Sequence, residues 1–242
     1  MRLSGEQRGP SEDSEASGRS RLRLGVLFSG TGRTLENLVA CCRDGTVPAE
    51  VVVAISNRVE APGNAVATRL GVPLEVIDAE ATDAEAPAGE AARTPNPSAS
   101  SFSTAVTSTL LRSGVDLVVL AGLLRYYDIP STFRGRVLNI HPSLLPAHGG
   151  KGMYGRRVHE AVLAAGERFS GCTVHFAGDT YDRGPILLQR VVGVATGDSP
   201  ETLGARVFAQ ECIAYPEALR LYAEGRAVLK EGRVHLRPTP GA

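Results

Sequence analysis

A chain of 242 residues is long enough for one large domain or two small ones with a substantial core. Its hydrophobic content of 43% and charged content of 21% are ordinary for a globular protein, and 26 basic residues balance 26 acidic ones. A net charge of zero offers no case for nucleic-acid binding, so any anionic small molecule must be bound by local groups.

The sequence has no apolar run of the roughly 18 residues that a membrane span needs, and its polar first 20 residues lack the apolar core of a signal peptide. We therefore expect a cytoplasmic protein with no membrane partner. Its four cysteines show no zinc-like spacing and are expected to be free thiols.

The predicted elements of the first half alternate between strands and helices. After a disordered tail at 1–20 we expect strand 22–28, a helix from Thr34 as its N-cap to about residue 43, strand 51–56, helix 63–70 and strand 74–77. Residues 78–100, rich in Ala, Glu, Thr, Pro and Ser, are expected to form a flexible surface insertion. Helix 102–112, strand 115–122 and a short helix after Pro130 follow.

The second half is predicted to add strand 137–141, helix 156–165 and strands 171–177 and 186–192, which are close enough to pair antiparallel. A long helix to about residue 222 has Ser199 as its N-cap, and a hairpin or edge strand occupies 227–236. We expect one domain over 21–236 and a C-terminal tail at 237–242. Continuous apolar strands alternating with helices predict an α/β fold: a doubly wound, mostly parallel, mixed sheet with helices on both faces.

Polar residues follow three of the predicted strands at their carboxyl ends, the edge at which open α/β sheets bind ligands. Asn139 and His141 are two residues apart at the end of strand 137–141, so both side chains leave on the same face before Pro142 stops the strand. An amide donor beside a titratable ring is a candidate reaction centre. An ordinary His-Pro turn is the alternative.

A glycine loop with the sequence Ser-Gly-Thr-Gly-Arg-Thr follows the first strand at 29–34. The backbone N–H groups of such a loop and of a helix N-terminus can bind a phosphate, and Arg33 adds a positive charge. The loop lacks the Gly-Lys-Ser/Thr ending of a Walker loop, and Leu35 stands where the dinucleotide fingerprint has its third glycine. A tight turn between strand and helix is the alternative.

Five segments in order resemble the glycinamide ribonucleotide formyltransferases, a folate-dependent family of purine synthesis. They are 29–35, 120–125 (Leu-Ala-Gly-Leu-Leu-Arg), 139–146 (Asn-Ile-His-Pro-Ser-Leu-Leu-Pro), 170–175 (Ser-Gly-Cys-Thr-Val-His) and 182–185 (Asp-Arg-Gly-Pro), within a similarity that runs from about residue 22 to 234. The resemblance implies an enzyme that transfers the formyl group of its co-substrate 10-formyltetrahydrofolate to the primary amine of glycinamide ribonucleotide, through a tetrahedral intermediate. It implies no metal, small-molecule partners, and a monomer or homodimer.

The resemblance also implies roles for individual residues. Asn139, His141 and Asp182 match the catalytic residues, and His175 matches a supporting histidine. Gly32, Arg33 and Thr34 match the phosphate-binding residues, and Glu211 matches a ribose-binding residue. Leu124, Arg125 and Tyr127 match the folate-binding residues. The family commonly has Ser-Asn in place of Arg33 and Thr34, and a different sequence in place of loop 149–155.

Formyl transfer builds negative charge on the former carbonyl oxygen. The Asn139 amide and a His141 imidazolium are suitable donors to that oxygen, and one lost donor costs about 3–4 kcal/mol. We expect Asp182 to raise the pKa of His141, to orient its ring and to organise a water that carries the proton. His148 is expected to be a solvated loop residue and His159 a helix-surface residue.

Other activities compete with this prediction. A formyltetrahydrofolate hydrolase would use a similar trio, but those relatives carry an N-terminal regulatory domain, and only about 20 residues precede the first strand here. Another 10-formylfolate-dependent amine formyltransferase would share the Ser-Leu-Leu-Pro segment, although those acting on tRNA add a C-terminal β-domain and a basic surface. A silent nucleotide- or folate-binding module would have lost a member of the trio, and all three members are present.

Overall fold

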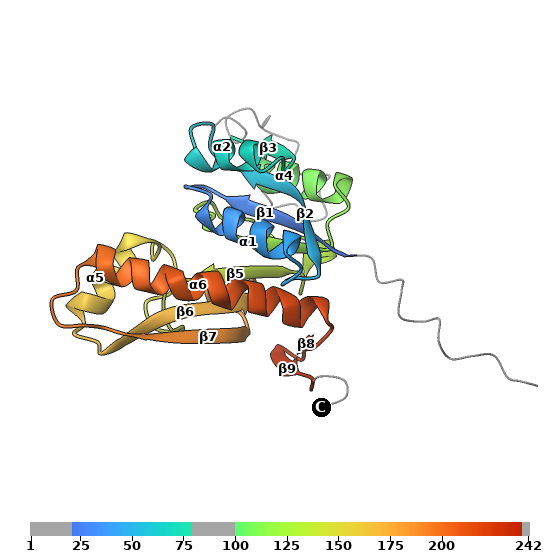
Figure 1. The fold of residues 1–242 in the computed structure, drawn as a ribbon. Helices are drawn as coiled ribbons and strands as arrows, with labels where there is room; N and C mark the ends of the chain where they lie inside the picture. Colours follow the sequence, from blue (N-terminus) through green and yellow to red (C-terminus); the bar gives the residue numbers. More distant parts are fainter. Residues whose placement is uncertain (1–20, 79–99, 239–242) are drawn as a thin grey trace, which may run out of the picture.

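Strand β1 (Leu22–Phe28) lies near the middle of the sheet, and its apolar side chains are buried on both faces. The computed structural model describes residues 21–78 and 100–238 (Figure 1). The predicted tail at 1–20, residues 79–99 of the predicted insertion and residues 239–242 of the predicted C-terminal tail lie outside the described residues.

Seven strands form one sheet in the order β3-β2-β1-β4-β5-β6-β7. The others are β2 (Ala49–Ser56), β3 (Leu74–Val76), β4 (Leu117–Leu120), β5 (Val137–His141), β6 (Phe169–Phe176) and β7 (Ile186–Gly193). Strands β1 to β5 pair in parallel, whereas β6 pairs antiparallel with both β5 and β7. The predicted mixed, mostly parallel sheet is confirmed. Strands β8 (Ala227–Lys230) and β9 (Arg233–Leu236) form a separate hairpin.

Helices cover both faces of this sheet, as the sequence predicts. One face carries α1 (Arg33–Arg43), α2 (Pro62–Arg69), α5 (Arg156–Ala164) and α6 (Pro200–Ala223), which share one hydrophobic core. The other face carries α4 (Ser101–Arg112) and the short 3-10 helix η2 (Ser131–Phe133), which share a second core. The long α6 packs on β6 and β7 and lies beside α1 (Figure 1).

Two helix starts test the predicted caps. Ser199 caps α6 as predicted, because its side chain accepts a hydrogen bond from the Thr202 N–H while the Thr202 hydroxyl accepts one from the Ser199 N–H. The prediction that Thr34 caps α1 is wrong. The cap is Gly32, whose φ of 76° is strained for any residue with a side chain. No side chain caps α1, so the first N–H groups of this helix have no side-chain acceptor from a cap.

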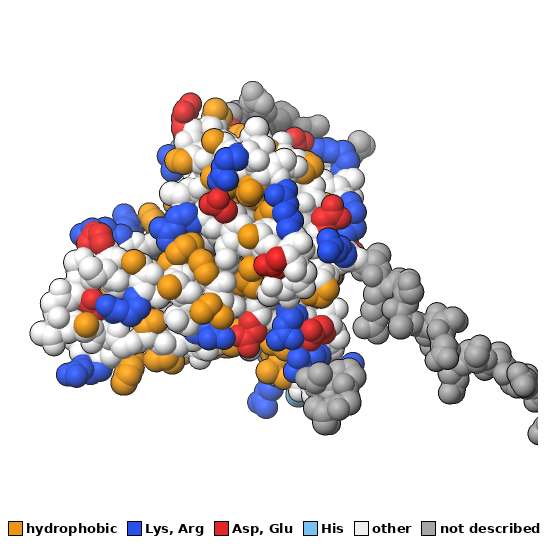
Figure 2. Space-filling model, viewed as in Figure 1, with side chains coloured by type: hydrophobic (Ala, Val, Ile, Leu, Met, Phe, Trp, Pro, Cys, Tyr) orange, Lys and Arg blue, Asp and Glu red, His pale blue; other side chains and the backbone are white. Residues whose placement is uncertain are grey.

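The visible surface mixes charges of both signs. On the face shown in Figure 2, Lys and Arg side chains are scattered with Asp and Glu side chains between them, rather than gathered in one patch. Among residues 21–78 and 100–238, no helix has the length and apolar character that crossing a bilayer requires.

Tyr215 ties α6 to the sheet from within the core. Its hydroxyl lies 3.0 Å from the carbonyl oxygen of Leu120, the last residue of β4, and 2.9 Å from that of Leu138, the second residue of β5. We expect Tyr215→Phe to lower the free energy of unfolding by about 1–2 kcal/mol, because buried carbonyls lose a donor. Urea titration measures this. Tyr222→Phe is the control, with an expected change below about 0.5 kcal/mol; equal effects would contradict the role of the Tyr215 hydroxyl.

Candidate active site

The three predicted loops meet at the carboxyl edge of the sheet. The Ser29 hydroxyl oxygen, at the end of β1, accepts a hydrogen bond of 2.7 Å from the Leu124 N–H, and the Ser29 N–H donates to the Gly122 carbonyl at 3.2 Å. These bonds join the glycine loop after β1 to the loop after β4. Because β5 pairs with β4, its last residues lie next to both loops.

Asp182 brings the predicted catalytic residues together. The Asn139 amide nitrogen donates to Asp182 Oδ1 at 3.3 Å, and His141 Nδ1 lies 3.5 Å from Asp182 Oδ2. His175 Nε2 lies 3.6 Å from Oδ1, and the Gly150 N–H donates to Oδ2 at 2.9 Å. The four predicted side chains therefore form one cluster, although strands β5 and β6 and the loop after β6 supply them separately.

The antiparallel part of the sheet explains the placement of His175. Asn139 on β5 is directly opposite His175 on β6, so their side chains lie on the same face of the sheet. The Asn139 amide nitrogen lies 3.1 Å from His175 Nε2, and His175 Nδ1 lies 3.0 Å from the Phe176 carbonyl. A carbonyl can only accept, so Nδ1 carries a proton.

The loop between β6 and β7 holds Asp182 by close packing. Asp182 has a φ of 54°, a left-handed conformation that aspartate tolerates better than most residues. A Cβ at Gly184 would lie 1.7 Å from the Phe176 carbonyl oxygen, so only glycine fits there. Burial alone would raise the pKa of the Asp182 carboxyl. The contacts with the His175 and His141 rings and the Gly150 N–H outweigh burial, and the pKa lies below its ordinary value.

His141 departs from the prediction in one respect. Its Nε2 donates to the His148 carbonyl at 2.8 Å while Nδ1 faces Asp182, so only the imidazolium can donate from both nitrogens. The side chain is nevertheless buried, and burial lowers its pKa more than the Asp182 charge raises it. Asp182 thus raises the pKa of His141 as expected, but burial was not foreseen and outweighs it, so the neutral ring predominates near pH 7.

The glycine loop is packed against a residue that the sequence did not single out. Gly63, the second residue of α2, donates its N–H to the Gly30 carbonyl at 3.0 Å. A Cβ at Gly63 would lie 2.8 Å from the Gly30 oxygen and 2.9 Å from the Gly32 nitrogen. The close approach of α2 thus fixes the loop whose N–H groups are predicted to bind phosphate. Gly63 is the first residue of the predicted helix 63–70, and nothing in the sequence pattern indicated its contact with the glycine loop.

We expect Gly63→Ala to displace this loop. The Michaelis constant for a phosphate-bearing substrate should rise roughly tenfold, because a shift of the loop by a few tenths of an ångström misaligns its N–H groups. Steady-state kinetics with each substrate varied in turn measures the effect. Gly193→Ala is the control, since nothing lies within 4 Å of its added Cβ. Unchanged kinetics in Gly63→Ala would contradict the importance of this contact.

Arg33 and Glu211, predicted to bind phosphate and ribose, lie close together. The Arg33 guanidinium carbon is 3.6 Å from the centre of the Phe208 ring on α6, and Glu211 is three residues further along that helix. Burial raises the pKa of the Glu211 carboxyl to about 7, and the Arg33 charge opposes this shift. Thr34 follows in the first turn of α1.

The predicted folate-binding residues divide into two groups. The Leu124 and Arg125 side chains are exposed at the sheet edge. The Tyr127 side chain is buried in the second core, where its hydroxyl lies 3.0 Å from the Thr107 hydroxyl, so its predicted contact with folate stays a prediction for backbone groups rather than for the ring. Tyr126 and Tyr181 form an aromatic pair whose ring centres lie 5.0 Å apart. Sequence reasoning missed both.

Two further histidines also differ from their predictions. His148 is not simply solvated, because its Nε2 lies 2.8 Å from Glu167 Oε1. His159 is buried against Gly204 between α5 and α6, and its Nδ1 has no hydrogen-bond partner among the described residues. Within the described ranges, no group of three or more His, Cys, Asp or Glu side chains is arranged to hold a metal ion.

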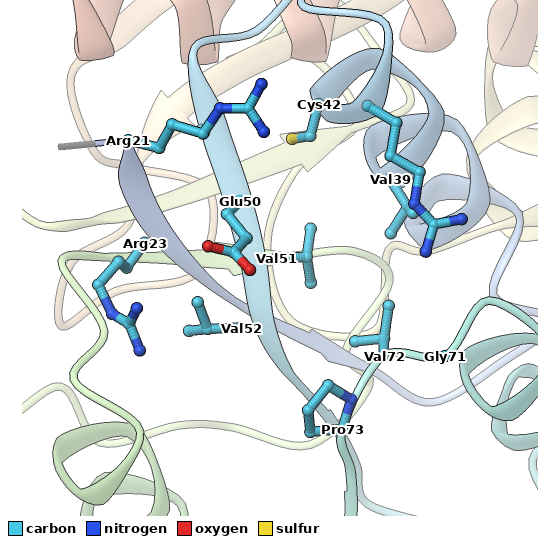
Figure 3. A pocket seen from close by; sticks show the side chains of 12 residues that line it. Arg21, Arg23, Val39, Cys42, Glu50, Val51, Val52, Gly71, Val72 and Pro73 are labelled. Atoms are coloured by element: carbon cyan, nitrogen blue, oxygen red, sulfur yellow. The ribbon is translucent and has the colours of Figure 1, made fainter.

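A cavity of about 390 Å³ lies at the opposite edge of the sheet (Figure 3). Arg21, Arg23 and Glu50, near the amino ends of β1 and β2, line it together with the end of α1 and the loop before β3. None of the predicted site residues lines this cavity. The catalytic cluster instead lies at the open carboxyl edge, beside the three loops.

Comparisons with known proteins identify the family of this chain. The family model described as formyl transferase matches residues 22–219. A chloroplastic phosphoribosylglycinamide formyltransferase of Arabidopsis thaliana is 38% identical over 89% of this chain and 70% of its own length, and the phosphoribosylglycinamide formyltransferase of Haemophilus influenzae is 33% identical over 88% and 93%. The crystal structure of glycinamide ribonucleotide transformylase 1 from Symbiobacterium toebii superposes with a TM-score of 0.79 at 39% identity, over 94% of this chain and 100% of that one. The chain belongs to the formyl transferase family, within its phosphoribosylglycinamide formyltransferase group.

Proposed function

We propose that this protein transfers the formyl group of 10-formyltetrahydrofolate to the primary amine of glycinamide ribonucleotide. The family uses a formylfolate as co-substrate, and the relatives named for this reaction match most of the chain. The observation that carries the proposal is the Asp182 cluster: an amide donor and two imidazole rings each lie within 3.6 Å of one carboxylate.

In the proposed reaction the substrate amine attacks the formyl carbon, forming a new C–N bond while the carbonyl oxygen takes the negative charge. The Asn139 amide and the His141 ring donate hydrogen bonds to that oxygen, a kind of stabilisation worth about 3–4 kcal/mol for each donor. Asp182 positions both donors and orients a water that moves the amine proton to N10 of the folate. The bond from the formyl carbon to N10 then breaks, releasing tetrahydrofolate and the formylated amine.

We propose that His141 becomes a strong hydrogen-bond donor by binding a proton during the reaction. Its lowered pKa leaves it neutral in the free protein near pH 7, while Asp182 lies ready to stabilise the charged ring. Charge developing on the substrate oxygen favours the imidazolium, so His141 gains donor strength as the tetrahedral intermediate forms. Its Nε2 donates to the His148 carbonyl here, and it can donate to a substrate only after that contact is exchanged.

The two substrates are proposed to approach from neighbouring loops. The phosphate of the ribonucleotide lies at Gly32, Arg33 and Thr34, at the N-terminus of α1, and Glu211 accepts hydrogen bonds from the ribose hydroxyls. The folate lies against Leu124 and the Tyr126–Tyr181 pair, which offers flat aromatic surface for its rings.

The test is an assay with purified protein, 10-formyltetrahydrofolate and glycinamide ribonucleotide, in which release of tetrahydrofolate is followed with and without the ribonucleotide. Release that requires the ribonucleotide, together with a formylated amide product identified by mass spectrometry, supports the proposal. Equal release without the ribonucleotide would make the protein a formyltetrahydrofolate hydrolase. Formylation of a different amine in a substrate panel would assign another acceptor.

A further inference from the structure

Phe208 contacts one of two oppositely charged groups in the proposed ribonucleotide site, Arg33, and lies one helical turn before the other, Glu211. Its ring face is 3.6 Å from the guanidinium carbon of Arg33, the first residue of α1. Glu211 projects from α6 three residues later, close enough for the Arg33 charge to act on it, yet no ion pair joins Arg33 to Glu211. Within the described residues the guanidinium is therefore stacked on the ring rather than paired with the carboxylate.

A second contact fixes the register of α1 against α6. The Asn37 amide nitrogen donates to the Cys212 carbonyl at 3.0 Å. Asn37 lies four residues after Arg33, and Cys212 lies four residues after Phe208, so one turn of each helix is matched to one turn of the other. The helices lie side by side on one face of the sheet (Figure 1). The Arg33–Phe208 contact is therefore part of a defined helix packing.

Arg33 and Glu211 are proposed to bind different parts of the substrate, so they must not pair with each other. A phosphate needs the guanidinium, whereas ribose hydroxyls need a carboxylate that can accept. If Arg33 folded onto Glu211, the bidentate ion pair would neutralise both groups and occupy their donors and acceptors. The electron-rich ring face attracts the guanidinium without using its N–H donors, which remain available to a phosphate.

We propose that Phe208 is a positioning residue that holds the Arg33 guanidinium over its ring, toward the substrate phosphate and away from Glu211. This inference rests on the proposed function for the identity of the substrate. The proposal gives Phe208, on α6, a supporting role for the phosphate-binding residue Arg33.

The experiment compares Phe208→Leu, which keeps apolar bulk but removes the ring, with Phe208→Tyr, which keeps the ring. Steady-state kinetics are measured with each substrate varied. In Phe208→Leu the KM for glycinamide ribonucleotide should rise roughly tenfold, with kcat and the KM for 10-formyltetrahydrofolate within about twofold of wild type. Phe208→Tyr should behave as wild type. A loss of kcat with unchanged KM for the ribonucleotide would overturn the proposal.

An Arg33→Met background separates positioning from simple packing. If Phe208 acts through the guanidinium, then Phe208→Leu changes the KM for the ribonucleotide in wild type and leaves it unchanged in Arg33→Met. An equal change in both backgrounds would show a packing role and overturn the proposal. Thermal denaturation of all four proteins verifies folding.

A binding measurement keeps this inference distinct from the proposed function. Ribose 5-phosphate, which carries the phosphate and ribose but no amine, is titrated into wild type and both Phe208 variants by calorimetry. Weaker binding to Phe208→Leu alone supports the positioning role, even if the assay identifies a different acceptor amine. Equal binding to all three proteins, or no binding to any, overturns it. Absence of ribonucleotide-dependent turnover in the wild type would count against the proposed function alone.

Discussion

Replacing Asp182 by asparagine should lower kcat about a thousandfold while the protein remains folded. Asn tolerates the left-handed φ of 54° at this position and has a similar size, so the loop conformation can persist. The charge that balances a protonated His141 is lost, however. One carboxylate oxygen also becomes an amide nitrogen, which cannot accept a hydrogen bond. Either the Asn139 amide or the Gly150 N–H therefore loses its acceptor. Single-turnover kinetics with both substrates saturating measures the chemical step directly.

Asp179→Asn is the matched control for this variant. Asp179 lies in the same loop, but its side chain is exposed and pairs only at the surface with Arg134, at 3.3 Å. Surface pairs of this kind contribute little, so kcat should stay within about twofold of wild type. A kcat in Asp182→Asn above about a tenth of the wild-type value would contradict both proton transfer and charge stabilisation by Asp182. The two variants together separate the role of the carboxylate from general disturbance of the loop.

The pKa shifts in the cluster also have a defined effect on stability. The depressed pKa of Asp182 contributes stability above the unfolded-state value of about 3.9, and this is lost as the pH falls through the folded-state pKa. The depressed pKa of His141 acts in the same direction, because the unfolded chain binds its proton more readily below about pH 6.5. The raised pKa of Glu211 acts oppositely, since it favours folding as the pH falls through about 7. Lowering the pH therefore reduces the contribution of Asp182 and His141 to the free energy of unfolding and increases that of Glu211.

The sheet was predictable from local pattern and order, whereas the grouping of Asp182 and His175 with Asn139 and His141 was predicted from the family resemblance. The apolar run before Asn139 predicts a buried strand, and the two-residue spacing to His141 predicts a common face. The antiparallel pairing of the strands that contain His175 and Ile186 brings the intervening loop, with Asp182, back toward β5. The packing of Gly63 and Phe208 was not predictable, because each contact joins segments that are separated in the sequence.

The errors have physical causes too. Two adjacent tyrosines in a loop look equivalent in the sequence, but the turn of the backbone buries Tyr127 in the second core and leaves Tyr126 beside Tyr181. The pKa of His141 was predicted from its carboxylate partner alone. Burial, which depends on the whole fold around β5, decides the direction of its shift. Sequence therefore predicts which groups assemble better than it predicts how far each is removed from water.

Asn139→Asp should give an enzyme whose activity depends on pH in a way that wild type does not. The Asn139 amide nitrogen lies 3.3 Å from Asp182 Oδ1, so the substitution places two carboxyl groups in contact in a poorly solvated site. Like-charge repulsion raises the pKa of the pair, which then binds one shared proton more tightly than either group would alone. When both groups are ionised, position 139 has no donor for the developing oxyanion, and kcat should fall about a thousandfold.

As the pH is lowered, the pair takes up its proton and position 139 regains an O–H donor. The ratio of variant kcat to wild-type kcat should therefore rise up to about tenfold for each pH unit above the pKa of the pair, because the protonated fraction changes by that factor. Taking the ratio removes the titration of the substrate amine, which both enzymes share. Asn139→Leu cannot titrate, so its ratio should stay low at every pH. If the aspartate and leucine variants show the same flat ratio, Asn139 does not act as a hydrogen-bond donor to the reacting carbonyl.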